Sequence, residues 1–306
     1  MTRAVVFGYH NVGVRCLKVL LSQGVDVPLV VTHDDAPGEV IWFDSVAAVA
    51  AERGIAVIAP ADPNAADVVG RVAAARPDFI FSFYYRQLLK GTMLALAPRG
   101  ALNMHGSLLP KYRGRVPVNW AIIHGEAETG ATLHYMTVKP DDGDIVAQTA
   151  VPILIDDTAG EVFNKVTVAA ELTLHRALPG LVAGNAPRIP QQIGTRSYFS
   201  GRKPEDGIID WSRTARSIHD LVRAVAPPYP GARTTLDGLP ARMLRTRVLD
   251  ESTRVAPGIA LEHGRLVAHC GGGGTLAVLA LEIEGEPVDP GAFARRFGSR
   301  RLAAGV

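Results

Sequence analysis

The stretch RAVVFGYHNVG (3–13) decides the fold of the first half of the chain. Its first part, RAVVFG (3–8), is a continuous apolar run of the kind that is buried in a parallel sheet. Asn11 is expected to cap the helix that follows, and Gly24 suits the end of that helix. A buried strand that leads directly into a helix predicts the first unit of an α/β sheet.

The same alternation of strand and helix continues over the next 170 residues. The sequence predicts a hairpin and a long helix that begins at the Thr158 and Glu161 capping box. Further strands are expected at 27–33, 55–60, 78–85 and 100–106, helices at 43–54 and near 64–76, and the hairpin strands at 129–138 and 144–153. This order predicts an open, mostly parallel α/β sheet in about the first 185 residues.

The composition of the chain changes after residue 184. The segment 184–207 is rich in Gly, Pro and polar residues, and a single helix is expected at 212–225. Short β-type runs separated by Gly-rich turns follow this helix. They predict a second, smaller and mainly β domain, with an open barrel as one arrangement.

Composition and charge exclude several classes of protein. The chain has 306 residues with 47% apolar composition, and a net charge of +2 gives no argument for nucleic-acid binding. We expect neither a signal peptide nor a transmembrane helix, because the apolar runs are short. Cys16 and Cys270 lie in apolar surroundings, which favours buried thiols in a reducing compartment. The sequence therefore predicts a cytoplasmic protein.

The turn after the first strand raises the question of a nicotinamide cofactor. Gly8 and Gly13 flank it, and Asp34 and Asp35 follow the second strand, where a dinucleotide fold places its ribose-binding acid. The middle glycine of G-x-G-x-x-G is missing, so we expect no NAD binding. The simpler interpretation is a plain strand-to-helix turn at the ligand-binding edge of the sheet.

The strongest catalytic signal is NMHGSLLPKYRGRVPVNW (103–120). Asn103 and His105 stand two apart on a predicted strand, so they face the same way. An Asn amide can stabilise an oxyanion, and a His can move a proton. The acidic turn PDDGD (140–144) offers Asp141, Asp142 and Asp144 as candidates for a third group. These residue types suit the attack of an amine on a carbonyl, although N-x-H and Asp-Asp-Gly also occur in structural roles. No metal-binding spacing is present, so no metal is expected.

Residues 103–136, followed by DDGD (141–144), resemble the folate-dependent formyltransferases. The family pattern is N-x-H, then S-L-L-P-x-x-R-G, then D-x-G, and this sequence contains each part. The resemblance implies a Rossmann-like catalytic domain over residues 1–190 and a smaller OB-like domain over 204–306. It also implies that 10-formyltetrahydrofolate is the co-substrate.

The resemblance assigns roles to individual positions. It implies that Asn103, His105 and Asp141 are catalytic, whereas Asp142 occupies the variable position of D-x-G. The positions that it implies for folate binding are Gln87, Leu88, Leu89, Arg115, Thr137, Val138, Lys139, Pro140 and Asp141.

The acceptor is expected to be a sugar nucleotide. The stretches VVFGYHNVG, FSFYYRQLL, RKPEDGIIDW and VRAVAPPYPGA are most similar to family members that formylate UDP-4-amino-4-deoxy-L-arabinose for lipid A modification and polymyxin resistance. In those members a decarboxylase domain follows, so that activity is expected here on a separate polypeptide.

Three alternatives to this function remain open, and two of them differ only in the acceptor. A TDP-4-amino-4,6-dideoxyhexose would undergo the same chemistry. Methionyl-tRNA is the second alternative, but the loop THDDAPGEVIWFDS (32–45) is acidic where tRNA-formylating members carry basic residues. The third is a sugar-nucleotide-binding module without catalytic activity.

Overall fold

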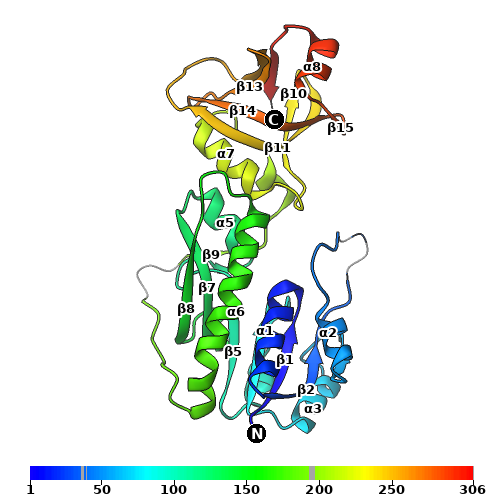
Figure 1. The fold of residues 1–306 in the computed structure, drawn as a ribbon, viewed down its shortest axis with the longest axis vertical. Coiled ribbons are helices and arrows are strands. Elements are labelled where there is room, and N and C mark those ends of the chain that lie inside the picture. The colour runs from blue at the N-terminus through cyan, green and yellow to red at the C-terminus, as the bar shows by residue number, and fades with distance from the viewer. Residues whose placement is uncertain (36–37, 39, 193–196, 306) are drawn as a thin grey trace. The chain divides into compact units, whose positions relative to one another are not determined.

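The computed structural model describes residues 1–35, 38, 40–192 and 197–305, and it divides into two compact units (Figure 1). The first unit comprises residues 1–117, 128–152 and 164–200. The second comprises residues 118–127, 153–163 and 201–306. Each unit contains its own sheet, so the two are described separately.

The sheet of the first unit has seven strands in the order β3-β2-β1-β4-β5-β7-β8. Its strands are β1 (Arg3–Gly8), β2 (Asp26–Val31), β3 (Ala56–Ile58), β4 (Phe79–Phe83), β5 (Gly100–His105), β7 (Glu128–Tyr135) and β8 (Ile145–Pro152). The first five run parallel, and β7 and β8 form the antiparallel edge. The predicted mostly parallel α/β sheet and its hairpin are confirmed.

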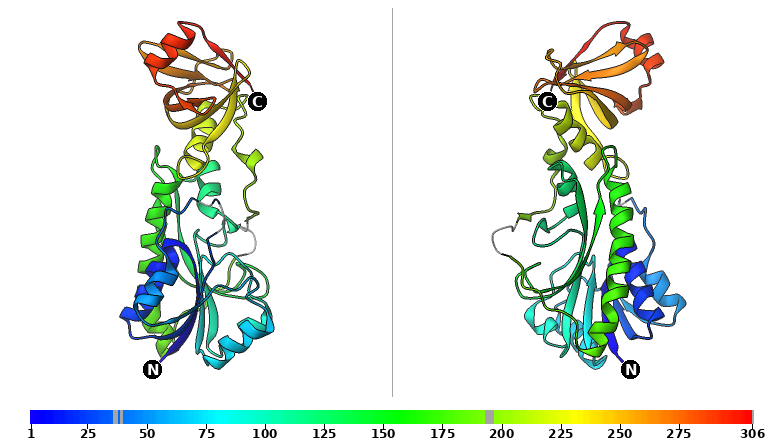
Figure 2. Two further views of the ribbon diagram at one scale, coloured as in Figure 1. Left: turned by 90° about the vertical axis from the view of Figure 1, so that its right-hand side faces the viewer. Right: turned by 60° about the vertical axis from the view of Figure 1, so that its left-hand side comes forward.

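Helices cover both faces of this sheet (Figure 2). They are α1 (His10–Ser22), α2 (Val46–Glu52), α3 (Ala66–Ala74), α4 (Gly91–Leu94) and α6 (Ala159–Ala183), whose first residues belong to the second unit. On one face, Arg15 of α1 donates two hydrogen bonds to Glu171 of α6. On the other face, Val68, Val72 and Met93 of α3 and α4 join the core with Val5 and Phe7 of β1.

One expected helix start was wrong. Tyr9, not Asn11, is the residue that precedes α1, and Asn11 lies inside the helix. The side-chain oxygen of Asn11 accepts instead from the backbone N–H of Asp44, at 2.8 Å. A contact with a distant loop therefore replaces the local cap. The capping box before α6 is confirmed, because Thr158 and Glu161 bond each other's backbone N–H groups.

The second unit is built on a six-stranded antiparallel barrel. Its strands are β10 (Ala232–Leu236), β11 (Leu239–Asp250), β12 (Gly258–Glu262), β13 (Arg265–His269), β14 (Thr275–Ile283) and β16 (Leu302–Gly305), with β15 (Glu286–Pro287) beside β14. Pairing of β11 with β14 closes the ring. The remaining helices are α5 (Pro117–Ile123), which begins at the end of a first-unit segment, α7 (Ala215–Ala224), α8 (Pro290–Phe297) and the 3-10 turn η2 (Pro204–Gly207). The expectation of a mainly β second domain is confirmed.

Two short strands complete the description of the first unit. Strand β6 (Arg113–Gly114) pairs in parallel with β9 (Tyr198–Phe199).

Both cysteines, Cys16 and Cys270, are buried free thiols, as the sequence indicated. Within the described residues, no helix combines the length and the apolar character needed to cross a membrane.

Candidate active site

Strand β5 carries the predicted catalytic pair to the carboxyl end of the parallel sheet. Asn103 and His105 lie two residues apart on this strand, with the apolar Leu102 and Met104 buried between the layers. Period-two alternation directs the polar pair to one face and the apolar pair to the other. The pair therefore lies where open α/β sheets bind their ligands.

Asp141, from the loop between β7 and β8, joins this pair. Its Oδ1 lies 3.6 Å from His105 Nδ1 and 3.5 Å from Asn103 Nδ2. Its Oδ2 accepts from the backbone N–H of Gly114 at 2.9 Å. Three segments that are separate in the sequence therefore place one carboxylate against an amide and an imidazole.

The carboxyl group of Asp141 is held in its ionised form. Burial, the largest single influence, would raise its pKa. Attraction to His105, a hydrogen bond and attraction to His134, and the Gly114 N–H act in the opposite direction, and together they hold the pKa of Asp141 well below its usual range. A carboxylate of this kind can orient an imidazole and attract its proton.

The orientation of His105 follows from its second ring nitrogen. Nε2 lies 2.7 Å from the carbonyl oxygen of Tyr112. A carbonyl oxygen only accepts, so Nε2 carries a proton and Nδ1 faces Asp141. The backbone of the 112–114 turn thus determines which nitrogen of His105 is directed at the carboxylate.

His134 is a further member of the cluster, although no sequence motif indicated a role for it. It is the direct cross-strand partner of Asn103 on β7. Its Nδ1 lies 2.9 Å from the carbonyl oxygen of Tyr135, and its Nε2 lies 3.2 Å from Asn103 Nδ2 and 3.5 Å from Asp141 Oδ1. The Asn103 amide is therefore oriented by His134. The Asn103 Nδ2 atom lies 3.5 Å from Asp141 Oδ1, which is long for a hydrogen bond, so the Asn103 amide can still donate to another acceptor.

Except for Arg115, which follows β6, the positions expected to bind folate lie on two loops that approach each other. A Cβ on Gly91, which follows the loop after β4, would lie 3.7 Å from Val138 of the β7–β8 loop. Leu88 and Val138 expose 69% and 81% of their surface, which is unusual for apolar residues on adjoining loops. The first loop is anchored at Gln87, whose Nε2 donates to the carbonyl of Ala61.

The other expected folate positions divide into exposed and packed ones. Leu89 is buried in the hydrophobic core, so its side chain supports the loop from below. Arg115, Thr137 and Lys139 are exposed, and the carbonyl of the half-buried Pro140 accepts from Arg113 at 2.7 Å.

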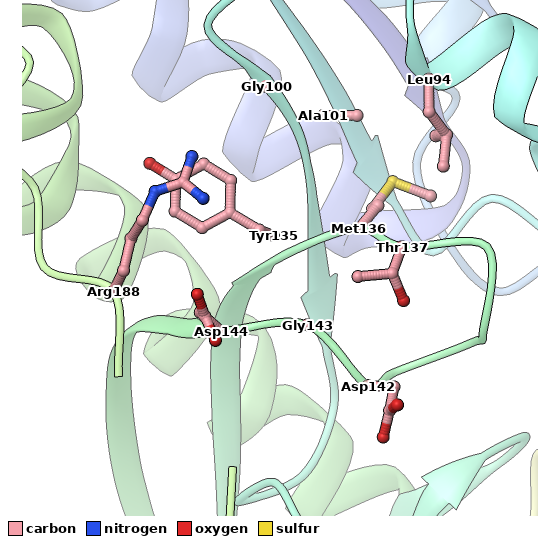
Figure 3. A pocket seen from close by; sticks show the side chains of 10 residues that line it. All are labelled: Leu94, Gly100, Ala101, Tyr135, Met136, Thr137, Asp142, Gly143, Asp144 and Arg188. Atoms are coloured by element: carbon pink, nitrogen blue, oxygen red, sulfur yellow. The ribbon is translucent and has the colours of Figure 1, made fainter. Parts of the chain in front are cut away.

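A cavity of about 330 Å³ lies beside the β7–β8 loop (Figure 3). Thr137 is the one predicted folate residue that lines it, together with Met136 and Leu94. On another side of the cavity, the Arg188 guanidinium lies 3.7 Å from the centre of the Tyr135 ring. The three predicted catalytic residues are not among its lining residues.

The turn after β1 does not resemble a nucleotide-phosphate loop. The Tyr9 hydroxyl donates to Asp35 at 2.7 Å. The carboxylate of Asp35, one of the two considered for a ribose contact, therefore already accepts a hydrogen bond from within the protein. His10 stacks on Phe43, with ring centres 3.9 Å apart. Among the described residues, no group of three or more His, Cys, Asp or Glu side chains is placed to hold a metal ion.

The sequence was compared with known protein families. Residues 3–178 match the formyl transferase family, and residues 202–298 match the formyl transferase C-terminal domain. The chain belongs to the formyl transferase family. The two matches cover most of both structural units, and the resemblance seen in the sequence is confirmed at the level of the family.

Solved structures of other formyl transferases share the fold. An N-formyltransferase from Helicobacter canadensis, solved with folinic acid and dTDP-3-aminofucose, is 20% identical, with a TM-score of 0.73 over 91% of this chain and 99% of that one. WlaRD, a sugar 3N-formyl transferase solved with dTDP and 5-N-formyl-THF, is 19% identical, with a TM-score of 0.69 over 90% and 97%.

HypX from Aquifex aeolicus, in complex with tetrahydrofolic acid, has a related structure. It is 17% identical, with a TM-score of 0.64 over 97% of this chain and 47% of that one. These three likenesses show that the chain shares its fold with each of these proteins.

Proposed function

We propose that this protein transfers the formyl group of 10-formyltetrahydrofolate to the amino group of a sugar nucleotide. The observation that carries the proposal is that Asn103 Nδ2 and His105 Nδ1 both lie within 3.6 Å of Asp141 Oδ1. This cluster occurs in a member of the formyl transferase family. The folate structures of two sugar N-formyltransferases with this fold support the choice of co-substrate.

The residues suit a direct transfer without a covalent enzyme intermediate. The amine of the sugar attacks the formyl carbon, and Asn103 stabilises the oxyanion of the tetrahedral intermediate. As the bond from carbon to folate N10 breaks, the proton lost by the amine passes through Asp141 and His105 to N10. The products are the N-formyl sugar nucleotide and tetrahydrofolate, so atoms and charge balance.

Folate is proposed to bind against the loop after β4 and the β7–β8 loop. Exposed Leu88 and Val138 would contact its ring system, and Arg115 would lie beside its carboxylates. Gln87, Leu89 and residues 137–141 would complete this site. Of these residues, Thr137 also lines the cavity beside the β7–β8 loop.

Two acceptors are supported by different observations. A dTDP-linked amino sugar, including a TDP-4-amino-4,6-dideoxyhexose, is the first candidate, because both sugar N-formyltransferases were solved with dTDP or a dTDP-amino sugar. UDP-4-amino-4-deoxy-L-arabinose is the second, because stretches such as VVFGYHNVG and VRAVAPPYPGA resemble the members that use it. The acidic residues Asp34 and Asp35 argue against tRNA in either case.

A substrate panel tests the proposal. Purified protein is incubated with 10-formyltetrahydrofolate and, separately, dTDP-3-amino and dTDP-4-amino sugars, UDP-4-amino-4-deoxy-L-arabinose and charged initiator tRNA. We expect formylation of at least one sugar nucleotide, with a shallow dependence on salt because few phosphates are bound. Faster formylation of the tRNA, with a steep salt dependence, would overturn the proposal.

A further inference from the structure

Residues 189–191 and 197–199, here called the connecting segment, contact both loops that hold the candidate catalytic groups. Strand β9 of this segment pairs in parallel with β6, which is part of the 112–114 turn. Ile189 forms an antiparallel bridge with Ile145, directly after the β7–β8 loop. The segment is about 45 to 90 residues away in sequence from the residues that it touches.

The first set of contacts holds the 112–114 turn. Ser197 Oγ accepts from the backbone N–H of Tyr112 at 2.7 Å, and the Ser197 carbonyl accepts from Arg113 N–H at 2.9 Å. The Phe199 ring stacks on Tyr112, with ring centres 5.3 Å apart and planes at 16°. The backbone of Gly114 approaches the Phe199 carbonyl so closely that a Cβ would collide with it. This close approach explains the glycine.

The turn needs external support because its backbone is strained. Tyr112 has a φ of 54°, in the left-handed region that a non-glycine residue rarely adopts. Such conformations persist where surrounding structure enforces them. The carbonyl of Tyr112 orients His105, and the N–H of Gly114 binds Asp141, so the strained turn contacts two candidate catalytic groups.

The second set of contacts holds the β7–β8 loop. Gln191, which is buried, donates from Nε2 to the carbonyl of Asp141 at 3.0 Å and to that of Gly143 at 2.8 Å. Asp141 itself has a φ of 52°. One amide group thus fixes the backbone on both sides of Asp142, next to a second strained residue.

We propose that Ser197 and Gln191 are positioning residues for formyl transfer, acting through Tyr112 on His105 and through the loop backbone on Asp141. Neither residue needs to touch a substrate for this role. The inference rests on the proposed catalytic roles of His105 and Asp141. It adds Ser197 and Gln191, which lie outside the Asn-His-Asp pattern, to the residues that efficient formyl transfer requires.

The test compares variants of the full-length protein. Ser197→Ala removes the hydroxyl bonded to Tyr112, and Gln191→Met removes both amide donors while keeping the side-chain length. Ser197→Thr keeps the hydroxyl and serves as the rescue. Tyr198→Ala is the matched control, because Tyr198 follows Ser197 directly in the sequence and its side chain is 63% exposed.

Turnover is measured with the acceptor that reacts fastest in the panel above. We expect Ser197→Ala and Gln191→Met each to lower kcat on the order of tenfold with KM changed less than about twofold, because small misplacements of catalytic groups reduce turnover strongly. Ser197→Thr and Tyr198→Ala should retain wild-type kcat. Thermal unfolding and binding of 5-formyltetrahydrofolate check that each variant is folded.

A spectroscopic measurement separates this inference from the proposed function. In protein labelled with ¹⁵N-histidine, the Nε2–H signal of His105 should shift or broaden in Ser197→Ala and stay unchanged in Tyr198→Ala. Absence of turnover in the wild type would defeat the proposed function, and the His105 signal would then decide the positioning role. Wild-type kcat and an unchanged His105 signal in folded Ser197→Ala would overturn it.

Discussion

Asp141 in the first unit and Asp220 in the second are both buried carboxylates next to a cationic or histidine partner, yet their pKa values move in opposite directions. Their side chains are 11% and 5% exposed, so burial alone does not distinguish them. For both groups burial is the largest influence and raises the pKa. The pKa of Asp141 nevertheless ends well below its usual range, whereas that of Asp220 ends above it.

The difference lies in how many segments supply partners. Asp141 faces His105 from β5, His134 from β7 and the Gly114 N–H from the strained turn. Asp220 has its main partner, Arg223, on its own helix, with Nε and NH2 both at 2.8 Å from one oxygen, and a smaller contribution from His219. Several converging partners can outweigh desolvation, while one buried ion pair often does not. The ionised carboxylate occurs where the proposed chemistry needs it.

The largest expected effect comes from neutralising the first carboxylate. Asp141→Asn keeps the shape of the side chain but removes the charge that attracts the His105 proton, so kcat should fall by about 10²–10⁴-fold. Steady-state kinetics measure this. Asp220→Asn, the same substitution in the second unit, should retain wild-type kcat. An Asp141→Asn enzyme within tenfold of wild type would remove the carboxylate from the mechanism.

Truncating Asn103 should have the next largest effect. Loss of one oxyanion donor raises the barrier by about 2.7–4 kcal/mol, so kcat in Asn103→Ala should fall by about 10²–10³-fold. The equivalent truncation of Asn164, an exposed residue of α6, is the control. His105→Ala should show a loss of at least about 10²-fold as well. A folded Asn103→Ala protein with near wild-type turnover would exclude the oxyanion role.

The two carboxylates should also contribute to stability with opposite dependence on pH. A lowered native pKa means that Asp141 stabilises the fold above its unfolded value of about 3.9, and that this contribution is lost as pH falls through the native pKa. A raised native pKa means that the Asp220 contribution is present below about pH 3.9 and is lost as pH rises through the native pKa.

Urea unfolding of the wild type and of each Asn variant, at about pH 3, 4 and 7, measures these contributions. The stability difference between wild type and Asp141→Asn should grow with pH, whereas the difference for Asp220→Asn should shrink. If both stability differences changed in the same direction with pH, the contrast between Asp141 and Asp220 would be contradicted.

The smallest expected effect is that of replacing Asp220 and Arg223 together on stability at neutral pH. Because the pKa of Asp220 is raised, its ionised form gains less from Arg223 than it loses by burial. Replacing both partners with apolar side chains of similar size, Asp220→Leu with Arg223→Met, should therefore change the free energy of unfolding by no more than about 1 kcal/mol, with a gain as the favoured sign, because no buried charge is left unpaired. A loss of about 3 kcal/mol or more would show that the pair stabilises the second unit.

Much of the fold could be predicted because its elements leave local patterns. A strand covered on both faces must be apolar throughout, as RAVVFG is, and the capping box at Thr158 and Glu161 is a local interaction. The pairing of Asn103 with His105 was predicted for the same reason, since alternation along one strand fixes the shared face. The acidic turn at 140–144 was a candidate source of the third group, but only the resemblance to a family selected Asp141 from its three aspartates.

The parts that could not be predicted depend on contacts between distant segments. Asn11 has the residue type of a helix cap, but its partner is Asp44, more than 30 residues away. His134 stands in an apolar strand, and its importance appears only from the register that places it opposite Asn103. Ser197 and Gln191 follow no motif, because their role depends on which backbone groups lie beside them.

The pairing of β6 with β9 has a consequence for where the chain can be divided. The match to the N-terminal family ends at residue 178, and a fragment cut there would contain Asn103, His105 and Asp141. It would lack Gln191, Ser197 and Phe199, the residues that hold the strained turn and the neighbouring loop. On the ribosome, likewise, the nascent site gains its last supports only after synthesis has passed residue 199, about 60 residues beyond Asp141.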